Sequence, residues 1–514
     1  LKIMKFCTIL TILSLTILSL FADDHAKDHN DFIPIFDGKT LKNWNGDPKF
    51  WSVKDGAITG QTTAANPTRG NTFIIWEAGE LDDFELKLKF KISAGNSGIQ
   101  FRSFKLENGP DEWRVGGYQA DFEAGDTWSG TLYGEQFGGV FAKRGQRINV
   151  DDKGKKTQGE AVGDPKKLND VIKKGDWNEY HIIARGYNIK QSINGQLMAE
   201  VTDNGPKKRR QGILAFQLHA GPPMTVQFKD VMLKRLKLVD AKKICFYAGT
   251  RSHGWGAHEH NAGNILLAKR LRAHYGDKIV TSLYKDGWPK DPTAMQNADA
   301  LIMFCTGGGA HFAKFHLRQI DYHQKRGMGV GSIHYAVEIP KGNQGGDKFL
   351  EWMGGFFEAH WSVNPHWTPE FKTFPDHPVA NGVKPFKIND EWYYHMRFRD
   401  EMKGITPILS ALPGPETLKR RDGAHSGNPH VRASVLERKE TQHVVWATEN
   451  ENGAGRGFGF TGAHVHNNWA DDNFRKVGLN AIAWIAGLDI PEGGVPSQRP
   501  DKAELESNQD YAKR

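Results

Sequence analysis

The feature that most constrains the fold is a strict alternation of apolar and polar residues. Every second residue from Phe84 to Ile92 is apolar, and glutamate or lysine stands between them. Because successive side chains of a strand point to opposite faces, this pattern predicts a half-buried antiparallel strand. Similar segments recur at Trp51 to Ile58, Ile99 to Phe104, Tyr118 to Phe122, Tyr180 to Ile193, Gln196 to Val201, Ile213 to His219 and Thr225 to Leu236. Many short strands without amphipathic helices between them predict a β-sandwich over residues 32–238.

The hydrophobic pattern changes after Leu238. Compact apolar runs alternate with helix-like spacing in the order Lys243 to Ala248, Asn261 to Tyr275, Ala300 to Cys305, Phe312 to Arg326 and Met328 to Ile333, and a last helix is expected from Asp472 to Ala486. Strand, helix, strand in succession predicts a parallel sheet with right-handed crossovers. The sequence therefore predicts a multidomain chain, with an α/β domain over residues 241–492 and a loose, polar tail over residues 493–514.

The first 22 residues have the layout of a secretory signal peptide, because Lys2 and Lys5 precede an uncharged, apolar run. We therefore expect residues 1–22 to be removed and the protein to be periplasmic or secreted. Signal peptide cleavage sites usually have small residues on both sides of one variable residue. Here Leu20 and Ala22 flank Phe21, so only one of the two is small, and a retained membrane anchor is the alternative. No later stretch could span a bilayer, and no stable membrane insertion is expected once the signal is removed.

Cysteine content and charge narrow the classes of partner. Cys245 and Cys305 would remain after signal removal, and both lie in apolar runs typical of buried strands, which predicts inert thiols instead of a disulfide framework. The formal net charge of +8 is spread over loop-like stretches, and the basic run from Lys207 to Arg210 has no interleaved aromatic residues. We expect no nucleic-acid partner.

Alternation also indicates which polar side chains share one face of the predicted sandwich. The residues expected there are Gln100, Arg102, Gln119, Asp121, Glu123, Gln217 and His219, rimmed by Trp113, Trp128, Tyr133 and Trp177. Sugar rings offer C–H faces and hydroxyl edges, so aromatic rings beside planar hydrogen-bonding groups suit a carbohydrate substrate. The alternative interpretation is an ordinary solvent-facing sheet surface.

Four stretches of this half resemble the 3-keto-disaccharide hydrolase domain family. They are NSGIQFR (Asn96 to Arg102), GYQAD (Gly117 to Asp121), SGTLYGE (Ser129 to Glu135) and GILAFQLH (Gly212 to His219). The resemblance covers about Phe32 to Leu238, and it implies a concanavalin-like jelly roll that acts on glycosides already oxidised at C3.

The chemistry of such a substrate suggests roles for these side chains. A C3 ketone acidifies the hydrogen at C2, so a base there can drive loss of the C1 substituent. Asp121 or His219 is expected as the base and Glu135 as the acid. Arg102, Gln100 or Tyr133 is expected to donate to the enolate oxygen. Gln100, Arg102, Gln119, Gln217, Trp128 and Trp177 are expected to bind substrate. A conventional two-carboxylate glycosidase using Asp121 and Glu135 is the alternative.

Histidines follow four predicted strands of the second half. His253, His258 and His260 follow the first, His311 the next, His334 the third, and His464 and His466 the last. Open parallel sheets bind ligands at the carboxyl ends of their strands, so we expect a second site made of His253, His258, His260, His334, His464 and His466. The pairs His258/His260 and His464/His466 could hold a divalent metal ion, although they match no strong zinc signature. No other cofactor is expected.

This half resembles the trehalose-utilisation, ThuA-like family over about Lys242 to Pro491. The motifs are RSHGWGAHEH (Arg251 to His260), GVGSIHYA (Gly329 to Ala336), DHPVANGV (Asp376 to Val383), NDEWY (Asn389 to Tyr393) and TGAHVHNNWADDNFRKVGLNAIAW (Thr461 to Trp484). The resemblance implies sugar metabolism and a flavodoxin-like α/β fold similar to class I glutamine amidotransferases. Ser332-Ile333-His334 stands where those enzymes carry a nucleophilic cysteine, so cysteine chemistry is not expected there.

No glycine-rich stretch completes a dinucleotide fingerprint, so a separate sugar-oxidising dehydrogenase is the expected protein partner. The clustered titratable groups favour an exported enzyme that cleaves 3-keto-glycosides or related oxidised disaccharides by base-assisted elimination or hydrolysis. The alternative is a lectin-like, carbohydrate-binding protein in which the ThuA-like half is a non-catalytic scaffold.

Overall fold

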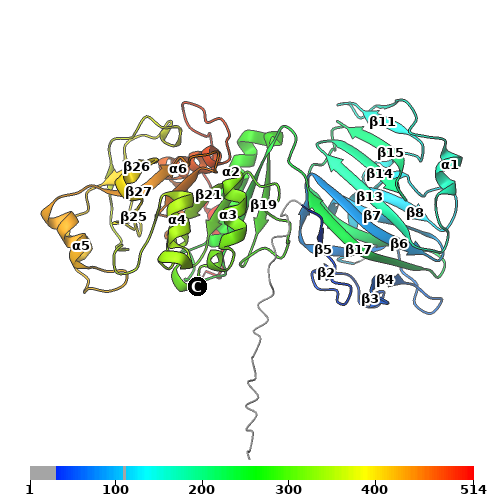
Figure 1. The fold of residues 1–514 in the computed structure, drawn as a ribbon, viewed down its shortest axis with the longest axis horizontal. Helices are drawn as coiled ribbons and strands as arrows, with labels where there is room; N and C mark the ends of the chain where they lie inside the picture. Colours follow the sequence, from blue (N-terminus) through cyan, green and yellow to red (C-terminus); the bar gives the residue numbers. More distant parts are fainter. Residues whose placement is uncertain (1–30, 108–110, 514) are drawn as a thin grey trace, which may run out of the picture.

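The computed structural model describes residues 31–107 and 111–513, and within them the chain forms two domains that lie side by side (Figure 1). The predicted signal peptide lies outside the described residues. None of the helices in the described ranges is long and apolar enough to cross a membrane.

The first domain is a sandwich of two sheets, as alternation predicts. One sheet has the order β12 (Lys156–Gln158), β11 (Arg147–Val150), β15 (Gln196–Asp203), β14 (Asn188–Ile193), β13 (Asn178–Arg185), β6 (Phe84–Ile92), β17 (Thr225–Arg235), β4 (Ala57–Gln61), β3 (Trp51–Lys54), with β1 (Ile33–Pro34) beside β17. The other has the order β10 (Gly139–Ala142), β9 (Leu132–Glu135), β8 (Val115–Glu123), β7 (Asn96–Lys105), β16 (Gly212–Leu218), β5 (Thr72–Leu81), β2 (Trp44–Asn45). The apolar faces of both sheets form one core, and the short helix α1 (Pro165–Asp170) lies at one end.

The second domain is built on one sheet of the order β19 (Ile279–Tyr284), β18 (Lys242–Ala248), β20 (Ala300–Phe304), β21 (Gly329–Ile333), β28 (Gly457–Phe460), β27 (Gln442–Thr448), β26 (Ile405–Ala411). The first five of these strands run parallel, and β27 pairs antiparallel with both β28 and β26. In chain order the parallel strands are arranged 2-1-3-4-5, which is the order of flavodoxin-like sheets. Two short antiparallel pairs lie in the long segment before β26: β22 (Gly355–Phe356) with β25 (Arg397–Phe398), and β23 (Glu370–Phe371) with β24 (Phe386–Lys387).

Helices cover both faces of this sheet. Alternate residues of β18 enter different cores: Ile244 and Phe246 pack with α2 (His260–Tyr275) and α6 (Asp472–Ile485), while Cys245 and Tyr247 pack with α3 (Leu317–Lys325) and α4 (Gly346–Met353). A strand covered on both faces needs a continuous apolar run, and that is what its sequence has.

Cys245 and Cys305 are buried and free, which confirms the prediction of core thiols.

Two expectations for this domain need correction. The helix expected from Phe312 to Arg326 begins as a 3-10 turn (Phe312–Phe315) and becomes α3 only at Leu317, because the backbone of His316 is not helical. The tail is not loose: it forms α7 (Lys502–Glu506), and Glu504 pairs with the buried Arg270. A buried guanidinium needs a partner, so this contact holds the tail on the domain.

The two domains are joined by a buried charge network at the point where the chain crosses from β5 to β6. Asp82, which lies at this crossing, pairs with Lys243 of the second domain at 2.7 Å and with Arg235 of the first at 3.3 Å. Arg235 in turn pairs with Asp291 of the second domain at 2.6 Å. All four side chains are fully buried or nearly so, which makes the junction part of the interior of the protein and not a flexible hinge.

Replacing Asp82 with asparagine should therefore lower the free energy of unfolding by about 3–5 kcal/mol, because buried Lys243 and Arg235 would lose a charged partner. The matched control is Asp230→Asn, which removes a solvent-exposed pair with Lys89 and should cost about 0–1 kcal/mol. Denaturant unfolding of both variants measures the difference. Equal stability of the two variants would contradict a buried junction.

Candidate functional sites

The first candidate site is a cavity of about 710 Å³ on the outer, polar face of the seven-stranded sheet. It is lined by side chains of β8, β9 and β16 and of the adjoining loops: Asn71, Gln119, Asp121, Glu123, Trp128, Tyr133, Glu135, Gln217 and His219. Tyr118, Ala120 and Phe122 of β8 point the other way into the core, so the alternation of one strand separates the core from the cavity. The structure thus brings together most of the side chains expected at a sugar site.

A relay of side-chain amides orients Asp121 at the cavity wall. Gln100 donates from Nε2 to Gln119 Oε1 at 2.6 Å, and Gln119 donates from its own Nε2 to Asp121 Oδ1 at 2.6 Å. Because the oxygen of Gln119 is occupied by Gln100, its amide nitrogen must face Asp121. Gly98 permits this arrangement, since a Cβ there would lie 2.4 Å from the Gln119 side chain.

The two carboxyl groups of the cavity are poorly solvated. Asp121 is 4% exposed. Burial raises its pKa to about 8; the hydrogen bond from Gln119 opposes this rise, while the charges of Glu135 and Glu123 add to it. Burial also raises the pKa of Glu135, which accepts a long hydrogen bond from Asn71 at 3.5 Å. The raised pKa makes Asp121 a stronger base than an ordinary aspartate, and burial makes Glu135 a candidate acid.

Arg102 does not belong to this site, which corrects the face-sharing prediction. The pairing of β7 shifts register between Phe101 and Phe104, and Arg102 has a positive φ of 48°. This irregularity turns its side chain away from Gln100. Arg102 is fully buried beside the crossing from β5 to β6, where it pairs with Asp83 at 2.8 Å.

Three other expected residues have different positions. Gln100 shares the predicted face but is fully buried beneath Gln119, so it acts as a positioning residue and does not line the cavity. Trp177 lies beside Lys91 and Lys229 of the other sheet, away from the cavity. Trp113 donates to Asn45 and packs in a small separate cluster. Trp128 lines the cavity and is 38% exposed, so it is the aromatic surface available to a sugar ring.

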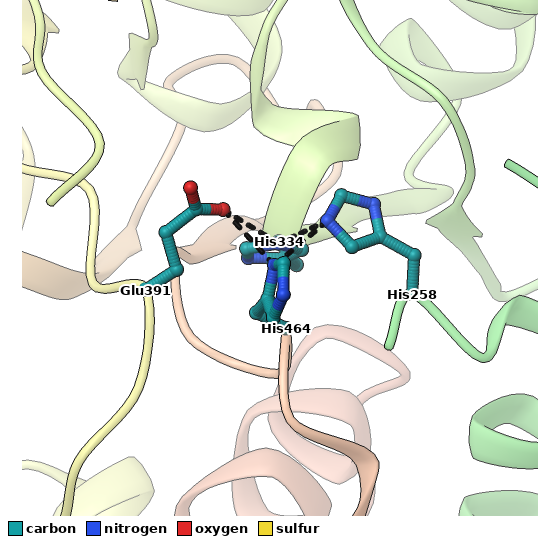
Figure 2. Close-up of side chains that lie close together, drawn as sticks. All are labelled: His258, His334, Glu391 and His464. Carbon is teal, nitrogen blue, oxygen red and sulfur yellow. Dashed lines mark hydrogen bonds and ion pairs between the residues drawn. The ribbon is translucent and has the colours of Figure 1, made fainter. Parts of the chain in front are cut away.

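The second candidate site lies at the carboxyl ends of the parallel strands in the α/β domain. Figure 2 shows His258, His334, Glu391 and His464 converging from four separate segments. His258 Nε2 lies 3.0 Å from His334 Nε2 and 2.9 Å from His464 Nδ1. Glu391 Oε2 lies 3.1 Å from His464 Nδ1 and 3.6 Å from His334 Nε2. These are the residues that could hold a metal ion in the described part of the chain.

The fold explains how these four side chains meet. His258 follows β18, His334 follows β21, and His464 follows β28, so the parallel strands deliver all three imidazoles to one edge. Asp390, which is fully buried, accepts hydrogen bonds from the backbone N–H groups of Ala463 and Val465. This contact fixes the loop that carries His464 against the segment that carries Glu391.

The charge state of the cluster is set by burial. Burial and the neighbouring imidazoles hold the pKa of His258 well below its ordinary value, and burial does the same for His334. His334 donates from Nδ1 to the backbone oxygen of Thr461 at 2.8 Å, so its Nε2 presents a lone pair to His258, Glu391 and the hydroxyl of Tyr393. Neutral imidazole is the form in which histidine binds metals.

The two His-x-His pairs do not act as pairs, which corrects the predicted metal ligands. His260 is the first residue of α2 and bonds to the backbone oxygen of Thr250, and His466 is the first residue of a 3-10 helix (His466–Ala470). In each pair the chain turns into a helix, so the extended backbone needed to aim both rings the same way is lost. His253 stacks on His258 with ring centroids 3.6 Å apart and is exposed, so it lies beside the cluster and not within it. His311 is buried and hydrogen-bonded to its neighbours.

Glu391 is the cluster residue that the sequence analysis did not assign. It lies within the NDEWY motif, so a carboxylate was visible there. No periodic pattern surrounds that motif, because Glu391 belongs to the long irregular segment between β22 and β25. Its position at the sheet edge depends on tertiary contacts such as the hydrogen bond from Asn364 at 3.1 Å.

Two family models match the chain, one in each half. Residues 31–234 match the 3-keto-alpha-glucoside-1,2-lyase-like domain, and residues 243–485 match the trehalose utilisation (ThuA) family. The chain joins a 3-keto-alpha-glucoside-1,2-lyase-like domain to a ThuA domain. Both are families of sugar metabolism, and the chain has a sugar-related function. No curated protein matches the chain significantly.

Solved structures resemble one half each. A candidate glycosyl hydrolase from Parabacteroides distasonis ATCC 8503 is 22% identical and covers 40% of this chain and 100% of its own, with a TM-score of 0.26. The carbohydrate-binding module CBM66 from Bacillus subtilis is 15% identical and covers 37% of this chain and 95% of its own, with a TM-score of 0.25. A candidate ThuA-like protein from Bacteroides uniformis ATCC 8492 is 18% identical to this chain, with a TM-score of 0.34. The match covers 49% of this chain and 94% of the Bacteroides protein.

Proposed function

We propose that the lyase-like domain cleaves 3-keto-glycosides by base-assisted elimination, with Asp121 as the base. One observation carries this proposal: Asp121 is a buried carboxyl group on the wall of a sugar-sized cavity, and its pKa is raised to about 8. A carboxylate with this pKa accepts a proton far more readily than an ordinary aspartate does. Abstraction of the C2 hydrogen next to a ketone is the step that requires such a base.

The remaining cavity residues have roles that complete the reaction. Asp121 takes the C2 proton, and the C2–H electrons form the enolate of the C3 ketone. Gln217 and Tyr133 are the donors available to its developing negative charge. Collapse of the enolate breaks the C1–O bond, and Glu135, whose pKa is raised by burial, is the acid that protonates the departing oxygen. Water added later across the C1=C2 bond gives the free keto sugar. The ketone is supplied by a separate sugar-oxidising dehydrogenase, in the periplasm or outside the cell.

A second candidate function is carbohydrate binding without catalysis. The exposed Trp128 beside buried amides is what a lectin would also present to a sugar ring. The buried pair of Asp121 and Glu135 favours catalysis, because burying two carboxyl groups is costly and binding a neutral sugar does not require it. Incubating the protein with a 3-keto-disaccharide and with its unoxidised parent separates the two functions. Catalysis releases product from the ketone alone, whereas a lectin retains sugar and releases no product.

Asp121→Asn should lower kcat/KM for the 3-keto-disaccharide by about 10²–10⁴-fold, because an amide cannot accept the C2 proton. Asp170→Asn, an exposed aspartate of α1, is the matched control and should leave the rate unchanged. A substrate deuterated at C2 should react several-fold more slowly with the unmodified protein. A rate that is insensitive to C2 deuteration and to Asp121→Asn would contradict elimination.

The same assignment predicts a pH profile. Only the deprotonated Asp121 can act as the base, so kcat/KM should rise with pH from neutrality and level off above the pKa of about 8. The profile is measured with a 3-keto-disaccharide at low substrate concentration. A rate that falls over this range would instead give Asp121 the role of an acid.

A further inference from the structure

The cluster at the edge of the ThuA domain contains contacts that hydrogen bonds alone cannot explain. Three close pairs join His258 Nε2 to His334 Nε2 (3.0 Å), His258 Nε2 to His464 Nδ1 (2.9 Å), and His464 Nδ1 to Glu391 Oε2 (3.1 Å). Each pair needs one proton between its two atoms, and His334 Nε2 carries none because its proton is on Nδ1.

With Glu391 ionised, no placement of protons satisfies all three pairs. If His258 Nε2 and His464 Nδ1 both carry protons, two N–H groups face each other at 2.9 Å. If only His258 carries one, the lone pair of His464 faces the Glu391 carboxylate. If only His464 carries one, the lone pairs of His258 and His334 face each other. A cation among the four atoms removes every conflict, because each atom can then present a lone pair to it.

The spacing also fits a metal ion. Ligands bound about 2.1 Å from a metal lie about 3.4 Å apart in a tetrahedron and about 3.0 Å apart at neighbouring positions of an octahedron. The four measured neighbour distances range from 2.9 to 3.6 Å. Three imidazoles with one carboxylate suit zinc, cobalt, manganese or iron, whereas calcium and magnesium prefer oxygen ligands alone.

Two of the four side chains in the cluster, Glu391 and His464, are partly exposed to solvent. His258 and His334 are 2% and 0% exposed, while the side chains of Glu391 and His464 keep 13% and 17% of their exposure. The exposed His253 stacks on His258, and His366 contacts His464 with ring centroids 4.8 Å apart. Tyr393 reaches His334 Nε2 with its hydroxyl at 3.2 Å. A ligand can therefore approach the ion from the side of Glu391 and His464, among groups that bind oxygen-rich molecules.

We propose that His258, His334, Glu391 and His464 bind one divalent transition-metal ion, and that this ion takes a sugar with a carbonyl oxygen next to a hydroxyl oxygen. The carbonyl and hydroxyl oxygens close a five-membered chelate ring on one ion. A pair of ordinary hydroxyls closes the same ring, but the ketone lowers the pKa of its neighbouring hydroxyl, so the hydroxyketone can bind as the stronger alkoxide ligand. The choice of sugar rests on the proposed function, because the keto sugar that the first domain releases belongs to this class. The metal site itself does not depend on that function.

Metal analysis of the full chain, purified without a histidine tag, stripped with chelator and reloaded with cobalt(II), tests the site. About one ion per chain is expected. His334→Gln and Glu391→Gln should each reduce it to below about one tenth. His260→Gln and His466→Gln are the matched controls, since each replaces the other histidine of a His-x-His pair, and both should keep about one ion. Circular dichroism verifies folding, and Glu391→Gln keeps the test decisive if His334→Gln does not fold.

Less than stoichiometric metal in the folded, reloaded protein would overturn the proposal. An equal loss of metal in His466→Gln and Glu391→Gln, with both folded, would overturn the ligand assignment.

The cobalt(II) absorption band tests the sugar. Adding a 3-keto-disaccharide to the cobalt protein should shift the band, and adding the unoxidised parent should not. Using the Asp121→Asn variant separates the two proposals, because it stops cleavage in the first domain while leaving the metal site intact. A band that fails to respond in both proteins refutes the sugar assignment whatever the first domain does. A response together with failed cleavage in the unmodified protein would refute only the proposed function.

Discussion

The structure depends on two adjacent buried carboxylates, Asp82 and Asp83, which pair with buried cations. They lie where the chain leaves one sheet of the sandwich and enters the other. Asp82 reaches Lys243 and Arg235 and so ties the domains, while Asp83 reaches Arg102 and the backbone N–H of Gly186. Burial alone would raise the pKa of Asp82, but the charges of Lys243 and Arg235 outweigh it and hold the pKa at about 2. The carboxylate therefore stays charged, and the junction stays closed, across the physiological pH range.

The two candidate sites use buried polar groups in opposite ways. In the cavity of the lyase-like domain, the Asp121 carboxyl receives one hydrogen bond from Gln119 and otherwise faces a poorly solvated pocket, so its pKa rises and it gains basicity. In the ThuA domain, the ligand atoms of three histidines and one glutamate lie close together and cannot all be paired by hydrogen bonds among themselves. This arrangement favours a cation. Each arrangement costs stability, and each is held by a neighbour that does no chemistry: Gln100 in the first, Asp390 in the second.

The sequence predicted the sites where local periodicity controls the direction of a side chain. Gln119 and Asp121 share a face because β8 is regular, and His258, His334 and His464 share an edge because parallel strands end together. Predictions failed where the regular pattern breaks. Arg102 follows a register shift, and His260 and His466 begin helices. Trp177 was placed by residue type alone, and it lies on the other sheet.

The sequence by itself determined the two domains, the type of sheet in each and the polar strip of β8, because these depend on a period that can be counted along the chain. Only the tertiary structure decided that Glu391 completes the histidine cluster, that Arg102 pairs with Asp83 inside the first domain, and that Glu504 anchors the tail. The positions of these residues depend on partners far away in the chain. A buried charge needs an opposite charge beside it, but this requirement produces no periodic pattern in the sequence.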